Sequence, residues 1–446
     1  MEFAEGAAVV VAAPPAEVAV SGVHVWCGGR PEVVVGQRVK VGAAVSETPA
    51  GRGGSISPIA GTVRRIVPVV VAGEGPTQTV MSHAGARAYV VSVEAEQPRS
   101  PTDWEAALPN RLRLDAWLPA LRRVGHWLEP ALGPSVIRQL ETCESRPPQR
   151  LVCVGLDRFP PQPLRSSLLA SFPEEAVVGT RLLADLCGAP DAVLLMSRRP
   201  RLSAALRPFC RDFRVRLLAT DNVYPAADPT LVAARLGTTP ESRRLPFGAN
   251  PAEHGLVLVS PWTVIRLGRW YRRGRLDIAR PQFFAFPHRQ STMTVTWALP
   301  GQPLAELDGA LSGDALQLSG RLIVGDAMTG RPIVPAKVVR TADDAGELGR
   351  FDLDDGWTPP PTVGEAELLL TVLSPPGVAP EEPCISCGWC VDVCPTRLQP
   401  IRLVEQLARE RRSAAVDDQR QWCIRCGLCT HACPSAIPLA QRIAQG

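Results

Sequence analysis

Eight of the thirteen cysteines lie between Cys384 and Cys433, in two copies of one pattern. The first copy runs from Cys384 to Pro395 and the second from Cys423 to Pro434, and both have the form C-x2-C-x2-C-x3-C-P. Three closely spaced cysteines can wrap a tight loop around a cubane and aim three thiolates at three of its irons. The pattern therefore predicts two 4Fe–4S clusters.

The ligands of each cluster are expected to come from both copies, because the fourth cysteine of such a run binds the other cluster in two-cluster ferredoxins. The first predicted set is Cys384, Cys387, Cys390 and Cys433, and the second is Cys394, Cys423, Cys426 and Cys429. Gly388 and Gly427 would allow close backbone approach to the sulfurs. The side chains expected to form a dry shell are Ile385, Val391, Val393, Ile424, Leu428 and Ile437.

Zinc and disulfides are the alternatives for these cysteines. Structural zinc takes paired C-x2-C units and has no use for a third step or a trailing proline. Disulfides staple small secreted domains, and this chain has 446 residues. The other cysteines are scattered and are expected to be buried thiols: Cys27, Cys143, Cys153, Cys187 and Cys210.

Length and composition set further bounds. A chain of 446 residues predicts about three domains. The net charge of +4 gives little support to nucleic-acid binding. No apolar run approaches the ~18 residues of a spanning helix, and the acidic start, Met1 to Glu5, is unlike a signal peptide. We therefore expect a cytoplasmic protein whose membrane association, if any, is peripheral and runs through a partner.

The elements before the cysteines fall into three regions. Residues 1–100 place valines around turn glycines and resemble the barrel-sandwich hybrid of lipoyl and biotinyl carriers, without a lysine at the expected tip, 49–51. Residues 105–283 alternate strand and helix patterns, which predicts an α/β domain with a largely parallel sheet. Within it, Trp262 to Arg273 predicts an amphipathic helix with a strongly basic exposed face. Residues 284–350 predict a small β-rich, β-grasp-like domain.

Prolines dominate the approach to the cysteine region. Residues 351–382 are expected to be a Pro-rich connector around a helix or strand at Glu365 to Leu373. Residues 383–446 then predict an α-helical, ferredoxin-like domain with two clusters. A helix from Ile401 to Arg411 is expected between the two motifs. The predicted fold class is thus multidomain, α/β and α+β.

This arrangement resembles the C subunit of the Rnf complex, an ion-translocating ferredoxin:NAD oxidoreductase. The matching segments are Gly36–Val39, Ile59–Val63, Gly325–Gly330 and Cys423–Leu439. The resemblance implies a peripheral subunit on the inner face of the cell membrane. It also implies partners among the other subunits of a membrane redox complex, with a donor such as ferredoxin or an NADH-linked protein.

The central region departs from that family, which resembles the flavin-binding subunit of respiratory complex I. The family carries a Gly-Gly-Ala-Gly-Phe-Pro loop and a later Glu-Cys-Glu-Pro stretch. Here the segment from Val124 to Pro163 has only isolated glycines, Gly125, Gly133 and Gly155. FMN is therefore a doubtful cofactor, and we predict that flavin and nicotinamide binding are lost. Arginines such as Arg122, Arg123 and Arg138 could bind a phosphate or form a solvated face.

Three functions remain open at this point. The first is an electron-transfer subunit with two 4Fe–4S clusters and no catalytic residues of its own. The second is an active FMN- and NADH-dependent oxidoreductase, including a cobalamin-reductase-like protein. The third is a scaffold in which the clusters only staple the C-terminal domain.

Overall fold

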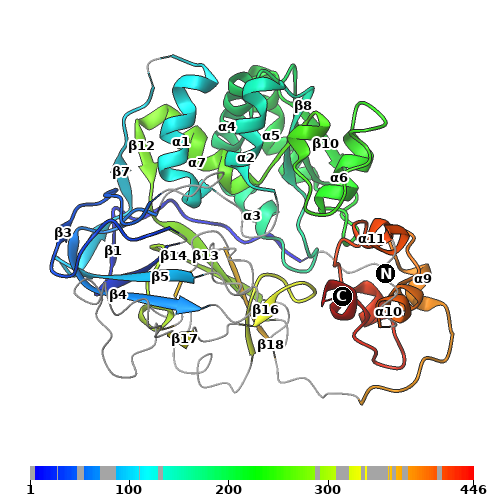
Figure 1. The fold of residues 1–446 in the computed structure, drawn as a ribbon. Helices are drawn as coiled ribbons and strands as arrows, with labels where there is room; N and C mark the ends of the chain where they lie inside the picture. Colours follow the sequence, from blue (N-terminus) through cyan, green and yellow to red (C-terminus); the bar gives the residue numbers. More distant parts are fainter. Residues whose placement is uncertain are drawn as a thin grey trace.

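The structure is a computed structural model in which the chain forms a mixed α/β, multidomain protein, as predicted. It describes residues 6–27, 29–47, 55–70, 87–109, 111–128, 134–286, 292–307, 321–332, 337–338, 360, 362–363, 368–373, 380–408 and 414–445. The C-terminal helices lie at one end of the molecule, beside α6 (Pro229–Leu236) of the central region (Figure 1). Across these residues, no helix has the length and apolar character needed to span a bilayer.

The N-terminal region is built from strands. They are β1 (Glu17–Ala19), β2 (Gly22–Cys27), β3 (Arg38–Val39), β4 (Gly61–Val70), β5 (Arg87–Ala95), β6 (Arg99–Pro101) and β7 (Asp103–Glu105). The order β17-β4-β5-β2 brings in β17 (Lys337–Val338), a segment that the sequence assigned to the β-rich region. Alternate residues such as Val23, Val63 and Val93 enter one core, since successive side chains on a strand face opposite ways. The tip at 49–51 lies outside the described residues.

The central region contains the predicted parallel sheet, in the order β10-β9-β8-β11. Its strands are β8 (Arg150–Gly155), β9 (Asp191–Ser197), β10 (Arg216–Thr220) and β11 (Leu256–Val259). Its helices, besides α6, are α1 (Leu114–Leu128), α2 (Val136–Ser145), α3 (Leu164–Ser171), α4 (Pro173–Cys187), α5 (Pro200–Asp212), η1 (Pro251–His254) and α7 (Pro261–Arg273). Helices α4 and α7 approach to backbone contact, because a Cβ at Gly179 would lie 1.8 Å from the Val264 carbonyl oxygen.

Helix α7 has four arginines, of which Arg272 and Arg273 are exposed, as predicted for its basic face, whereas Arg266 and Arg269 are buried. Arg266 is 0% exposed and donates to the carbonyl oxygens of Asp277 and Ile278, at 2.7 and 3.0 Å. Arg269 forms an ion pair with Asp277, which is itself buried. Sequence periodicity could not show that β12 (Arg275–Asp277) turns back and supplies a buried carboxylate to the helix.

A second sheet has the order β14-β13-β18-β15-β16. Its strands are β13 (Arg280–Phe286), β14 (Thr292–Ala298), β15 (Arg321–Val324), β16 (Arg331–Pro332) and β18 (Leu369–Leu373), and η2 (Leu304–Glu306) packs beside it. The expected connector at 351–382 therefore includes a central strand. The reason is that Leu369–Leu373 is wholly apolar apart from one threonine, and it pairs with β13 on one side and β15 on the other.

The C-terminal region is helical. Its helices are α9 (Trp389–Asp392), α10 (Pro400–Ala408), α11 (Ala414–Arg420), α12 (Leu428–His431) and α13 (Leu439–Gln445). Helix α10 is the one expected between the two motifs, and residues 409–411 lie outside the described part. Leu403, Val416 and Leu439 form a small core together with Cys390 and Cys429. The hydrophobic interior of this region is thus built around the cysteine motifs.

Candidate metal centre

The two cysteine runs fold in the same way. Ser386 and Gly388 in the first run have φ angles of +55° and +82°, and Arg425 and Gly427 in the second have +53° and +80°. A left-handed residue other than glycine costs about 1–2 kcal/mol, so each loop is held in a tight turn that its surroundings must stabilise. A short helix, α9 or α12, begins directly after each glycine. The sequence repeat is therefore also a structural repeat.

Backbone amides point at several of the sulfurs. Ser386 N–H donates to Cys384 Sγ at 3.4 Å, and Leu398 N–H donates to Cys394 Sγ at 3.3 Å. Backbone donors at Arg425 and Leu428 act on Cys423 and Cys426 and favour their thiolates. Amide hydrogen bonds to sulfur are a principal means by which proteins stabilise and tune iron–sulfur clusters.

Cys394 lies within electrostatic range of Cys423, Cys426 and Cys429, although burial is the main cause of the raised pKa of all three thiols. Negative charge on Cys394 contributes to the raised pKa of Cys423, Cys426 and Cys429. In the first run, Cys384 and Cys387 act on Cys390 in the same way. Cys433 packs against the small core that contains Cys390 and Cys429.

Burial differs between the two runs. It is the main cause that raises the pKa of Cys426 to about 12 and of Cys429 to about 11. Cys384 and Cys387 are exposed. The thiols of Cys426 and Cys429 are thus protonated at neutral pH in the metal-free chain, and a metal must displace those protons.

The residues present fit a cubane. Within the described ranges, no three His, Cys, Asp or Glu side chains are arranged to hold a single metal ion. A cubane needs a different arrangement, because each of its four irons takes one thiolate. The donor set is all cysteine, and backbone amides point at two of the sulfurs.

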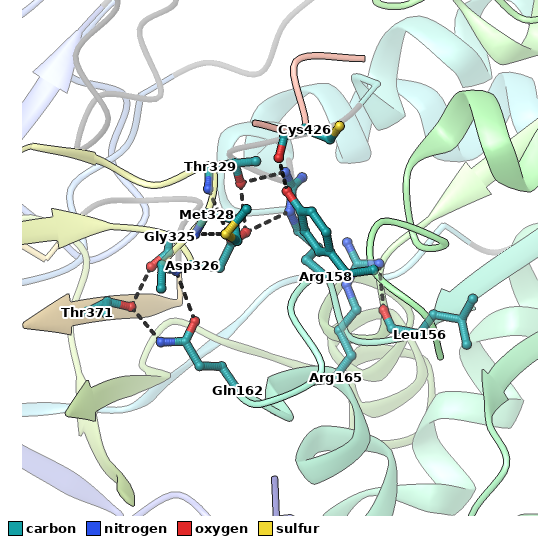
Figure 2. Close-up of polar contacts among 12 residues, drawn as sticks. Leu156, Arg158, Gln162, Arg165, Gly325, Asp326, Met328, Thr329, Thr371 and Cys426 are labelled. Carbon is teal, nitrogen blue, oxygen red and sulfur yellow. Dashed lines mark hydrogen bonds and ion pairs between the residues drawn. The ribbon is translucent and has the colours of Figure 1, made fainter. Parts of the chain in front are cut away.

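The second run docks on the body of the protein. The Tyr224 hydroxyl donates to the Cys426 carbonyl oxygen (Figure 2). Leu428 is buried with Phe159 and Tyr224, whose rings meet edge to face at 5.9 Å, and Met328 packs on the same cluster. This contact joins the second motif to the central region and to the Gly325–Gly330 loop.

A polar network connects the 325–330 loop, which contacts the second run, to the loop after β8 (Figure 2). Asp326 accepts from the backbone amides of Met328 and Thr329, at 2.9 and 2.8 Å, and lies 3.5 Å from Arg158. Gln162, in the loop after β8, connects the central region to the second sheet. Its side chain accepts from Ala327 N–H at 3.2 Å and donates to the Thr371 hydroxyl at 3.1 Å. These contacts tie the 325–330 loop to the loop after β8 and to β18.

Aromatic rings and arginines hold the other edge of the contact. The Arg425 guanidinium lies 5.1 Å from the Phe247 ring, and that of Arg244 lies 5.9 Å from the Trp422 ring. Phe247 N–H donates to the Gln421 carbonyl oxygen at 2.8 Å. The second cysteine loop is thus fastened on two sides to residues far away in sequence.

The apolar shell predicted around the clusters is only half buried. Ile424, Leu428 and Ile437 are buried, as expected. Ile385 and Val391, by contrast, are 67% and 37% exposed, and Trp389 beside them is 55% exposed. Val393 is partly buried and packs with Phe159, Tyr224 and Leu428. Among the described residues, the expected shell is therefore buried around the second run and partly exposed around the first.

Sequence reasoning missed the residues that receive the second run. Tyr224, Phe247 and Arg244 carry no local motif, and only the fold brings them to the cysteines. The Gly325–Gly330 loop was singled out by the family resemblance. Its role in packing against the second run could not be predicted from that resemblance.

The segment that corresponds to the family's flavin loop makes several internal hydrogen bonds. In open α/β sheets, ligands bind outside the carboxyl ends of the strands. Here the loop after β8 is closed by Asp157, which accepts from the Ser166 amide at 3.0 Å, and by the Gln162 bridge. Gly6 N–H donates to the Pro160 carbonyl oxygen at 3.0 Å, so the N-terminal segment lies along the same loop. Residues 129–133 of this segment lie outside the described part.

Comparison with known families defines the class of the C-terminal region. Residues 383–437 match the model of the 4Fe-4S dicluster domain. The match spans both cysteine runs. This region is therefore a ferredoxin-like iron–sulfur domain, and the electron-transport class that the motifs predicted is confirmed.

Two curated proteins are similar to this chain in sequence. The C subunit of the Na+-translocating ferredoxin:NAD+ oxidoreductase complex of Acetobacterium woodii is 24% identical over 273 residues, which are 59% of this chain and 54% of the relative. The C subunit of the ion-translocating oxidoreductase complex of Yersinia enterocolitica is 27% identical over 251 residues, which are 53% of this chain and 30% of the relative. The resemblance to the Rnf-type C subunit is thus confirmed, and the chain spans about half or less of these relatives.

The NAD+-reducing NiFe-hydrogenase in its H2-reduced state aligns with a TM-score of 0.43 and 17% identity, covering 74% of this chain and 63% of that one.

Proposed function

We propose that this chain is an electron-transfer subunit that carries two 4Fe–4S clusters in an Rnf-type, membrane-associated oxidoreductase complex. The observation that carries the proposal is the pair of matching cysteine loops, with Cys394 beside the thiols of the second run. The names of the relatives, both subunits of ion-translocating oxidoreductase complexes, support the setting.

The proposed ligands are those expected from the sequence. The first cluster takes Cys384, Cys387, Cys390 and Cys433, and the second takes Cys394, Cys423, Cys426 and Cys429. Such clusters accept and donate single electrons. The chain orients the thiolates through the left-handed turns at Gly388 and Gly427, and it excludes water from the second run with Leu428 and Phe159.

The surroundings of the proposed subunit follow from the same resemblance. We place it on the inner face of the cell membrane as a peripheral protein. Its partners would be the other subunits of the complex and a donor such as ferredoxin or an NADH-linked protein. Its parts would be a barrel-sandwich hybrid (1–100), a degenerate flavin-type domain like that of complex I (105–283), a β-grasp-like domain (284–350), a connector (351–382) and the cluster domain (383–446).

A metal count tests the cluster assignment. Because each cubane holds four irons and four sulfides, protein prepared without oxygen should contain about eight of each per chain. Elemental analysis with an assay for acid-labile sulfide measures both. Stoichiometric zinc, or about four irons after full reconstitution, would disprove the assignment of two clusters.

A flavin enzyme is the second candidate function. The loop after β8 is held by the buried Asp157, by the Gln162 bridge and by a hydrogen bond from Gly6, and it contains no pair of glycines that would expose converging amides to a phosphate. We therefore propose that the chain binds neither FMN nor NADH tightly and passes electrons between other proteins.

A further inference from the structure

The internal repeat allows one cysteine loop to be compared with the other. Ile385 and Trp389 of the first run correspond in position to Ile424 and Leu428 of the second. Ile424 and Leu428 are 6% and 4% exposed, whereas Ile385 and Trp389 are 67% and 55% exposed. The backbone turns are the same, so the difference lies in what covers each loop.

In the second loop, the corresponding apolar side chains are buried against other parts of the same chain. Leu428 lies in an apolar site formed by Phe159, Tyr224 and Met328 of the same chain. The first loop has three large exposed apolar side chains, Ile385, Trp389 and Val391, close in sequence to the exposed cysteines Cys384 and Cys387. We call these three side chains the apolar patch. A clustered, exposed patch of large apolar side chains marks an interaction site, and tryptophan is among the residues enriched at binding hot spots.

The two cysteine loops differ in charge, and this difference indicates the kind of partner that the first loop would bind. Residues 381–393 include the acidic Glu381, Glu382 and Asp392 and no lysine or arginine, and all three acids are exposed. Glu381 pairs with Arg442 at 2.7 Å, which leaves Glu382 and Asp392 beside the patch. Residues 420–432, on the docked loop, include two arginines and no acidic residue. A partner of the first loop therefore needs a basic rim, because interfaces match opposite potentials.

We propose that the patch of Ile385, Trp389 and Val391 is the docking site of a separate redox protein that presents an apolar surface with a basic rim. The patch would seal the first cluster as the body of the chain seals the second, and it would bring a partner to the edge of Cys384 and Cys387. This inference rests on the proposed function, because it assigns a partner to the first cluster.

Binding is measured with zinc-substituted mitochondrial cytochrome c, a small basic protein that exchanges no electron in the dark. Calorimetric titration of the full, cluster-loaded chain at low salt should show one site, weakened by added salt. Trp389→Ala should weaken it about tenfold, the cost of a moderate hot-spot residue. Phe213→Ala, which removes an exposed ring elsewhere, should leave it unchanged. Wild-type affinity in both Trp389→Ala and Ile385→Ser would overturn the proposal.

Electron transfer provides a second readout. The reduced chain gives one electron to ferric cytochrome c, which becomes ferrous without proton transfer. Trp389→Ala should slow this reaction about tenfold in rate constant, as weaker docking predicts, and leave reduction of cobalt(III) hexammine unchanged. If neither oxidant is reduced, the proposed function fails. If Trp389→Ala slows neither reaction while the wild type reduces both, only the docking site fails.

Two other occupants are distinguished by separate measurements. Sedimentation of the chain alone would reveal a dimer that Trp389→Ala dissolves, which would assign the patch to a second copy. Vesicles containing phosphatidylglycerol would reveal membrane binding that the same substitution abolishes. Either result would overturn the proposal. We expect a monomer and no vesicle binding, since the acidic loop repels an anionic surface.

Discussion

Replacing Cys433 by alanine should remove the cluster built on Cys384, Cys387 and Cys390 and leave the other cluster intact. Replacing Cys394 should do the reverse. The structure bears on the Cys394 variant in one way: burial is the main cause of the raised pKa of Cys426 and Cys429, and the Cys394 thiolate adds to it, so Cys394 lies within electrostatic range of both. Its own sulfur accepts from the Leu398 amide at 3.3 Å, which helps to fix its position.

Paired variants make this test specific. The reduced Cys433→Ala protein should give the same paramagnetic resonance spectrum as Cys387→Ala, and Cys394→Ala should match Cys426→Ala. Cys210→Ala is the control, because that buried thiol lies on α5, away from both runs, and both clusters should remain. The prediction fails if Cys433→Ala matches Cys426→Ala instead, since each cluster would then be bound within one run.

NADH alone should leave the absorbance of the oxidised clusters unchanged, and FMN should not bind at micromolar concentration. A flavin phosphate needs converging backbone amides or cations, and the loop after β8 contains Pro160, Pro161 and Pro163, which donate none. Gly155 serves packing, because a Cβ there would meet Leu169 Cδ1 at 2.5 Å.

The arginines that could have held a phosphate have other partners. Arg122 pairs with Glu141 at 2.9 Å, Arg123 lies over the Trp104 ring at 5.3 Å, and Arg138 is 3.9 Å from Glu253. Calorimetry with FMN and NADH, followed by anaerobic addition of NADH, measures the outcome. Stoichiometric FMN binding, or rapid bleaching of the clusters by NADH, would make the chain a flavin enzyme.

The sequence predicted the elements whose signals are local. The repeated cysteine spacing predicted both loops, which adopt matching left-handed turns at Gly388 and Gly427. Alternating apolar patterns predicted the parallel sheet of β8 to β11, because buried strands and amphipathic helices have distinct periods. The α10 helix between the motifs was predicted for the same reason.

What the sequence could not predict depends on contacts between distant segments. The sequence pattern indicated that Arg266 is a surface residue, but in the structure it is buried and donates hydrogen bonds to the carbonyl oxygens of Asp277 and Ile278. Ile385 and Ile424 occupy equal positions in equal motifs, yet only Ile424 is buried. An apolar side chain favours burial, but its sequence position does not show what buries it. Only the tertiary structure shows whether the same chain provides the contacting residues.

Reductive titration of the full chain, followed by paramagnetic resonance, tests the central claim most directly. A reduced 4Fe–4S cluster carries one unpaired electron, so two clusters should give about two spins per chain, and reoxidation should abolish the signal reversibly. Two reversible redox centres would establish an electron carrier. A single spin per chain would contradict the count of two, and clusters that stay silent down to strongly reducing potentials would show that they only staple the domain.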